Sequence, residues 1–203
     1  MDQRTDMTKE NKILVQDYNP EWKNLFEELK SVPTKHLAAD IIGIEHVGST
    51  SIPGAKAKAI IDLDIIIEND NSTLENVISK LKELGYLHLG NMGITGREAF
   101  KRLNSTTPNS GSQRHWVKHN LYVCKKGSIG LANHLDLRDY LIENPKKLLE
   151  YNELKQNLAN KFPFDIDSYV NGKTDFIVDI LNRMGMKSCD TQVIEEQNTL
   201  KVD

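Results

Sequence analysis

Apolar and polar positions alternate along the chain in patterns that predict helices and strands in turn. Asn19-Pro20-Glu21 supplies a cap residue, a proline suited to the first helical position and an acid in the first turn. Apolar residues then recur at helical spacing: Trp22, Leu25, Phe26 and Leu29. We therefore expect an amphipathic helix here, which Pro33 ends or kinks.

Two strands and a helix follow. The segment 41–47 is rich in β-branched residues and runs into a loop of small and hydroxyl residues, 48–54. The segment 60–67 is mostly aliphatic, which is typical of a central strand. A polar turn then leads into a helix over 72–84, which Gly85 ends.

In the second half of the chain, weaker sequence patterns predict strands, and helices follow them. Strands are expected near 86–89, 99–103 and 118–124, and helices over 133–142, 145–161 and 167–186, with a break at Asn144-Pro145. This layout predicts an α/β (α+β) protein with a short mixed β-sheet flanked by helices and a C-terminal helical cap.

The length of 203 residues suits one domain with short extensions. Residues 1–11 and 187–203 are polar and lack apolar periodicity, so we expect flexible ends around a single domain over 12–186.

Charge and composition exclude several classes of protein. The formal net charge of −3 provides no global cationic field for a long nucleic acid. The two cysteines, Cys124 and Cys189, show no metal-binding spacing, which argues against a disulfide framework. No signal peptide or membrane span is recognisable, so a cytoplasmic location is expected.

The main chemical signal is a glycine-serine loop followed by paired aspartates. Gly48, Ser49 and Thr50 come at the end of one strand, and Asp62-Leu63-Asp64 lies on the next. Residues two apart in a strand face the same side, so both carboxylates converge. At about 5 Å and an effective dielectric of about 20, their repulsion costs roughly 3 kcal/mol.

A divalent cation, a proton or a basic neighbour would relieve this repulsion. Mg²⁺ or Mn²⁺ suits the pair, because such ions accept carboxylate oxygens and complete their shell with water and substrate phosphates. The glycine lets backbone N–H groups approach those phosphates closely. The alternative interpretation is an ordinary turn and two aspartates at a sheet end, paired with lysines.

The same stretch resembles a known family. The segments 45–54 and 57–64 are similar to the hallmark of the GrpB family, which belongs to the nucleotidyltransferase superfamily. The similarity continues through 18–22, 96–100, 119–123, 134–141 and 144–145, with Tyr151, Lys155, Tyr169 and Lys173, and spans about residues 13–185.

This resemblance implies a nucleotidyltransferase-like fold. It implies an activity less directly, because the family's substrate is unassigned; some relatives are fused to dephospho-CoA kinase, which hints at a coenzyme or nucleotide setting. Active nucleotidyltransferases usually carry a third carboxylate on a later strand, but residues 119–124 contain no Asp or Glu. Three alternatives follow: His119 replaces that carboxylate as a metal ligand, the site holds one metal, or it binds nucleotide without catalysis.

Other residues are candidates for binding the substrate. Lys58 and Arg97 fall in family-like segments, and arginine binds phosphate with two hydrogen bonds. Tyr169 and Lys173, one helical turn apart, could close over a base and a phosphate, although a lysine lying along a helix face is equally ordinary.

A structural role is the simpler interpretation for two further histidines and one ion pair. His115 shares a face with His119 and could join a metal site, but a loop hydrogen bond is the simpler role. A hydrogen bond to a carbonyl is the simpler role for His46. Arg138 and Asp139 are expected to form a structural salt bridge.

The sequence thus predicts a metal-dependent nucleotidyltransferase acting on a nucleoside triphosphate and an unidentified small acceptor. Asp62, Asp64 and His119 would hold the metal; Gly48, Ser49, Thr50, Lys58, Arg97 and Lys173 would bind the nucleotide phosphates. Two alternatives stay open: a non-catalytic nucleotide or small-ligand binding module of the same fold, and a hydrolase built on a His/Asp metal site.

Overall fold

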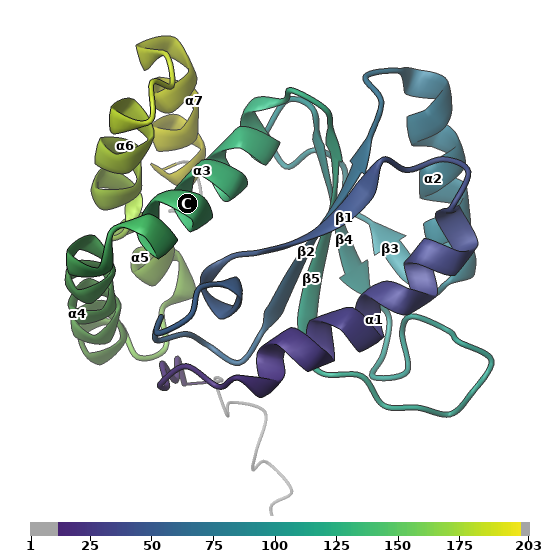
Figure 1. Cartoon of the computed structure of the whole chain (residues 1–203), viewed down its shortest axis with the longest axis horizontal. Helices are drawn as coiled ribbons and strands as arrows, with labels where there is room; N and C mark the ends of the chain where they lie inside the picture. The colour runs from purple at the N-terminus through teal and green to yellow at the C-terminus, as the bar shows by residue number, and fades with distance from the viewer. Residues whose placement is uncertain (1–11, 200–203) are drawn as a thin grey trace, which may run out of the picture.

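A five-stranded mixed sheet forms the centre of the computed structural model, which describes residues 12–199 (Figure 1). The strands are β1 (Gly43–Val47), β2 (Ile61–Ile67), β3 (Tyr86–His88), β4 (Arg97–Arg102) and β5 (His119–Lys125), in the order β1-β2-β5-β4-β3. Only β2 and β5 run parallel; the other neighbours are antiparallel. The expected flexible segment 1–11 lies outside the described residues.

Helices flank this sheet and fill the last third of the chain. They are α1 (Glu21–Leu37), α2 (Asn71–Glu83), α3 (Ile129–Glu143), α4 (Pro145–Lys161), α5 (Ile166–Asn171), α6 (Thr174–Arg183) and α7 (Ser188–Thr199), with a short 3₁₀ turn, η1 (Ser49–Ser51), after β1. In Figure 1, α1 and α2 lie together on one side and α3 to α7 gather on the other.

Strand β2 presents different residues on its two faces. Leu63 and Ile65 are fully buried against the residues of α1 and α2, among them Phe26 and Leu81. Each such buried side chain contributes about 1.5–3 kcal/mol relative to exposure. Asp62 and Asp64 alternate with these residues, so they point to the opposite face, toward the C-terminal helices.

The α/β class, the mixed sheet and the C-terminal helices confirm the coarse sequence prediction. The fourth helix begins at Pro145 and ends at Lys161, as the Asn144-Pro145 break predicts. Helix α3 begins earlier than expected, at Ile129, because the Ser128 side chain caps it by accepting a hydrogen bond from the Leu131 N–H.

Two predicted helix boundaries differ from the structure. Helix α1 continues through Pro33, which is buried inside it, so the proline does not end the helix. The single helix predicted over 167–186 is divided into α5 and α6 at Gly172 and Lys173. A Cβ on Gly172 would lie 2.4 Å from Leu158 Cδ2, so the chain turns where it packs closely on α4.

Much of the segment expected to be a flexible C-terminal tail forms helix α7 instead. Thr191 and Ile194 are each 4% exposed, and α7 packs on α5 and α6. Its few apolar residues were too widely spaced to predict a helix, and tertiary packing stabilises it. Among the described helices, none is both long and apolar enough to cross a membrane.

Helix α4 fastens the loop that follows η1. The buried Asn152 accepts a hydrogen bond from the Lys56 N–H at 2.8 Å and donates one to the Gly54 carbonyl at 3.0 Å. Both bonds join residues almost a hundred positions apart, so one amide ties the C-terminal helices to the segment between β1 and β2.

Replacing Asn152 with alanine is therefore expected to destabilise the fold. Asn152→Ala leaves two backbone groups without partners, and each such group costs about 1–3 kcal/mol when buried. We expect a loss of about 2–4 kcal/mol in the free energy of unfolding, measured by urea denaturation. Asn157→Ala, at an exposed position of the same helix, is the matched control and should change stability by less than about 0.5 kcal/mol.

Candidate functional site

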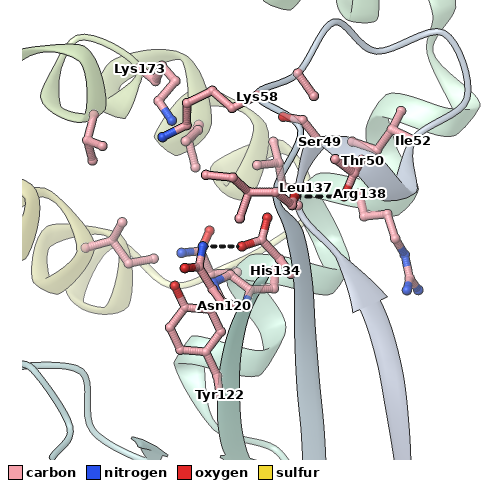
Figure 2. Close-up of a pocket in the computed structure, with 18 of the residues that line it drawn as sticks. Ser49, Thr50, Ile52, Lys58, Asn120, Tyr122, His134, Leu137, Arg138 and Lys173 are labelled. Carbon is pink, nitrogen blue, oxygen red and sulfur yellow. Dashed lines mark hydrogen bonds between the residues drawn. The ribbon is translucent and has the colours of Figure 1, made fainter. Parts of the chain in front are cut away.

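Most of the predicted site residues line one cavity of about 390 Å³, where the sheet meets the C-terminal helices. A cavity of this size suits a small molecule. The predicted residues that line it are Gly48, Ser49, Thr50, Lys58, Asp62, Arg97 and Lys173. Figure 2 shows its lining side chains, which come from the β1–β2 segment, β5, α3 and the region of Lys173.

The glycine-serine loop packs directly against the first aspartate. Gly48 has a φ of 69°, and a Cβ at this position would lie 2.3 Å from Asp62 Oδ2. Any larger residue would displace the carboxylate and adopt a disfavoured backbone conformation. Ser51 Oγ donates to the Gly48 carbonyl at 2.7 Å, which holds the turn closed.

The two aspartates share a face of the sheet but differ in surroundings. Asp62 lines the cavity, and burial raises the pKa of its carboxyl, opposed by a hydrogen bond from Asn120. Asp64 is fully buried behind it and its Oδ2 lies 2.8 Å from His134 Nδ1 on α3. The second oxygen of Asp64, Oδ1, is buried and has no hydrogen-bond partner among the described residues.

The parallel pairing of β2 with β5 places an amide where a third carboxylate was sought. Asn120 stands opposite Asp62 in the register, and its Nδ2 donates to Asp62 Oδ1 at 2.7 Å (Figure 2). Tyr122 stands opposite Asp64. Burial and the nearby carboxylates raise the pKa of the Tyr122 hydroxyl, so this phenol stays neutral at physiological pH.

Opposite the carboxylates, lysines gather around an aromatic ring. The ammonium groups of Lys58 and Lys173 lie 5.4 Å and 4.8 Å from the centre of the Tyr169 ring. Figure 2 shows the two lysines side by side. Desolvation and the Lys58 charge lower the pKa of Lys173 to about 8, and desolvation lowers the pKa of Lys58. Within residues 12–199, neither lysine forms an ion pair.

A third lysine, Lys155 on α4, lies beneath the loop and is 1% exposed. Its Nζ is 3.3 Å from Ser49 Oγ, also donates to the Lys56 carbonyl, and lies 4.2 Å from the centre of the Tyr151 ring. Desolvation, with a smaller effect of the Lys173 charge, lowers the pKa of Lys155 to about 7. The Gly48–Ser49 loop therefore rests on a buried amine.

Arg97 is placed at the cavity as predicted. It is 9% exposed, its guanidinium lies 4.8 Å from the centre of the Tyr122 ring, and its Nε is a buried donor without a partner among the described residues. An unsatisfied guanidinium donor beside a cavity can bind an anionic oxygen.

Two predicted residues have other roles in this structure. His119 neighbours Asp62 in the ladder but faces the other side of the sheet, where Nε2 contacts Tyr86 Oη and Nδ1 contacts the Val117 carbonyl, each at 2.9 Å. Both nitrogens are engaged, so the structure contradicts a site of Asp62, Asp64 and His119. The Thr50 hydroxyl is also occupied, by His46 and the Ile60 carbonyl.

The residues for which a structural role was expected make structural contacts. His46 contacts the Thr50 hydroxyl rather than a carbonyl, and burial lowers its pKa to about 4. His115 contacts Ser105 in an exposed loop. Arg138 forms the expected pair with Asp139 at 2.7 Å, and its second pair, with Glu45, joins α3 to β1.

Sequence reasoning did not single out Asn120, His134 or Lys155 as site residues. Asn120 and His134 lie in segments that resemble the family, and this was the one available signal. Their proximity to Asp62 and Asp64 depends on strand pairing and on the position of α3. Within the described residues, no group of three His, Cys, Asp or Glu side chains is arranged to hold a metal ion, so a cation here would need further ligands from substrate and water.

The buried lysine predicts a pH dependence of stability. Lys155 has a pKa of about 7 in the folded protein and an ordinary value of 10.5 when unfolded. Between these values the unfolded chain binds more protons, so stability rises with pH, by up to about 1.4 kcal/mol per pH unit. This contribution is complete above the unfolded value and is lost as pH falls to about 7.

Lys155→Met should therefore flatten the rise of unfolding free energy between pH 7.5 and 10, measured by urea denaturation. Lys146→Met, at an exposed position of the same helix, serves as the control and should keep the slope of the unmodified protein. An unchanged slope in Lys155→Met would mean that this amine is not desolvated in the folded state.

Comparison with known proteins places this geometry in a family. The family model described as "GrpB protein" matches residues 12–183, which ends before α7. The "Glutamate-rich protein GrpB" of Alkalihalophilus pseudofirmus is 34% identical over 172 residues, covering 85% of this chain and 95% of that protein.

A solved structure and a more distant relative extend the comparison. The crystal structure of conserved protein GrpB from Enterococcus faecalis matches with a TM-score of 0.70 and 30% identity, covering 84% of this chain and 96% of that chain. A protein of Mycolicibacterium paratuberculosis named "Dephospho-CoA kinase" is 26% identical over 186 residues, covering 81% of this chain and 44% of that protein. The family model and these full-length similarities show that this chain belongs to the GrpB family.

Proposed function

We propose that this protein is a metal-dependent nucleotidyltransferase that acts on a nucleoside triphosphate and a small acceptor. One observation carries the proposal: Lys58 and Lys173, which form no ion pair within the described residues, share one cavity with Asp62 and the Gly48–Ser49 loop, and Asp64 lies buried behind Asp62. Polyphosphate is a ligand that would satisfy the lysines and bring a divalent cation to the aspartates.

The cationic side supports binding of the phosphate chain. Desolvation and the Lys58 charge lower the pKa of Lys173, and an anion between the two lysines would oppose that effect. The Lys155 amine behind Ser49 adds positive charge beneath the loop at neutral pH and below. Arg97 also lines the cavity, and its Nε has no hydrogen-bond partner among the described residues. These groups surround the space that the Gly48–Ser49 loop borders.

The aspartate side fits one divalent cation. Asp64 Oδ1 is buried and has no hydrogen-bond partner among residues 12–199, and Asp62 lines the cavity beside it on the same face of β2. Two carboxylates with phosphate oxygens and water make a suitable shell for Mg²⁺ or Mn²⁺. Such an ion would neutralise charge on the transferring phosphate. Asn120 in place of a third carboxylate, and His119 on the other face, argue against a two-metal site.

The proposed reaction is a displacement at the α-phosphorus. An acceptor hydroxyl oxygen forms the new bond to that phosphorus, and the bond to the oxygen bridging the α- and β-phosphorus atoms breaks. Pyrophosphate leaves with the bonding electron pair, and the hydroxyl proton passes to solvent. The residues here contribute by positioning the phosphates and by compensating charge that develops on oxygen.

The fold and one relative's name give further support. A short mixed sheet with paired aspartates on a central strand, next to a glycine-serine loop, is what the proposed nucleotidyltransferase-like assignment requires. The relative named "Dephospho-CoA kinase" suggests a nucleotide or coenzyme setting, although this chain covers 44% of that protein.

One competing function has an observation in its favour. Asn120 donates to Asp62 where catalysis would favour a third carboxylate, and an amide adds no charge for a second metal. A module that binds nucleotide without turnover would show the same arrangement. A hydrolase centred on His119 has less support, because both of its ring nitrogens are engaged away from the aspartates.

Thermal-shift titration tests the nucleotide site. We expect ATP, GTP, CTP or UTP with Mg²⁺ or Mn²⁺ to raise the melting temperature by several degrees, since a ligand at 100 times its Kd stabilises by about 2.7 kcal/mol. Asp62→Asn/Asp64→Asn should abolish the metal-dependent part. Lys58→Gln/Lys173→Gln should raise the required nucleotide concentration at least ten-fold.

The control is Lys35→Gln/Lys146→Gln, which removes the same charge from exposed positions that do not line the cavity. It should behave like the unmodified protein. No shift with any of the four nucleotides would reject the proposal. A shift without pyrophosphate release across a panel of hydroxyl and phosphate acceptors would favour the binding module.

A further inference from the structure

A second cavity, of about 450 Å³, adjoins the first. Four residues line both: Ile60, Met92, Asn120 and Tyr122. Asn120 stands at the junction, because it also donates to Asp62 Oδ1 at 2.7 Å. A molecule in the second cavity would therefore lie next to the carboxylates without entering the space between the lysines.

The second cavity lies on the β3–β4 half of the sheet, on the face that carries the aspartates. Ala99 stands opposite Tyr122 in the β4–β5 register, and the Leu89 N–H donates to the Ala99 carbonyl at 2.9 Å. Leu89 and Met92 are 43% and 48% exposed, large fractions for apolar side chains that border a cavity. This floor is apolar and open to a ligand.

The charged residues around this floor are cationic. Lys101, Arg102 and Lys118 line the cavity, and no Asp or Glu among the described residues does. Arg102 is committed to the fold, because it donates to the Trp116 and Val117 carbonyls. Lys101 and Lys118 are exposed and, within the described part of the chain, form no ion pair. Positive charge over an apolar floor is complementary to an anion with an apolar body.

The loop between the two cavities is held in an unusual conformation. Met92 has a φ of 47°, in the left-handed region that side chains other than glycine avoid, at a cost of order 1–3 kcal/mol. Its side chain lines both cavities. The backbone thus places a flexible apolar side chain at the boundary, where it can contact ligands on either side.

We propose that the second cavity binds the acceptor, and that the acceptor is an amphipathic anion. Its apolar body lies on Leu89, Met92 and Ala99, and its anionic group pairs with Lys101 and Lys118. Its reactive hydroxyl reaches past Asn120 toward the carboxylates. The binding site is inferred from this cavity alone, whereas the acceptor role rests on the nucleotidyltransferase function proposed above.

Isothermal titration calorimetry with hexyl phosphate, inorganic phosphate and hexanol tests the site on the full chain. We expect hexyl phosphate to bind at least ten-fold more tightly than either of the other two, because only it offers both an alkyl chain and a charge. Lys101→Gln/Lys118→Gln should weaken hexyl phosphate at least ten-fold, and so should Leu89→Asn. The distant variant Lys35→Gln/Lys146→Gln should leave binding unchanged.

Lys58→Gln/Lys173→Gln distinguishes this cavity from the first. Binding of hexyl phosphate lost in that variant, but kept in Lys101→Gln/Lys118→Gln, would overturn the proposal, as would equal binding of hexyl phosphate and inorganic phosphate.

Nucleotide shifts should persist in Lys101→Gln/Lys118→Gln, which separates the two claims. If no nucleotide binds but hexyl phosphate behaves as expected, the cavity stands as an amphipathic-anion site and the acceptor role is rejected.

Discussion

Two carboxylates held on a buried strand are the constraint around which the cleft is organised. Asp62 and Asp64 point to one face of β2 because their neighbours Leu63 and Ile65 pack under α1 and α2. Like charges in such a place are costly, and each must find a partner. His134 contacts Asp64 and Asn120 donates to Asp62. Asp64 Oδ1 has no hydrogen-bond partner in the described part of the chain, and the cation proposed above would compensate its charge.

Three lysines near the aspartates carry the opposite charge and are also desolvated. Lys58, Lys155 and Lys173 come from three separate parts of the chain, and the loss of solvent lowers the pKa of each. Within the described residues Lys58 and Lys173 have no ion-pair partner, and desolvating such cations does not by itself stabilise a fold, which is consistent with the anionic ligand proposed above. Lys58 and Lys173 thus share a cavity with Asp62, and a metal-polyphosphate complex would contact both the lysines and the aspartate.

Helix α7 adds a feature outside the family match, which ends at residue 183. Ile194 of α7 is buried and contributes to the lining of the first cavity. The family core therefore supplies the carboxylates, the loop and the lysines, whereas part of the wall of the cavity belongs to a segment beyond it. Differences in such a segment would change the shape of the cavity without changing its charges.

The sequence by itself determined the local elements and part of the site. Alternation along 60–67 predicted that Asp62 and Asp64 share a face, Gly48 was predicted to approach phosphate and in the structure packs against Asp62, and Pro145 marked a helix start. These features succeed because they depend on residues near one another in the chain. The resemblance to the GrpB family added Lys58, Arg97 and Lys173, which do reach the cavity.

Only the tertiary structure decided which distant residues meet. The order β1-β2-β5-β4-β3 and the β2–β5 register bring Asn120, not His119, to the side of Asp62. Side chains alternate with a period of two, so a difference of one position moves a residue to the opposite face of the sheet. The sequence has no signal for that register, nor for the helix packing that buries Lys155 under Ser49, because both depend on contacts between segments far apart in the chain.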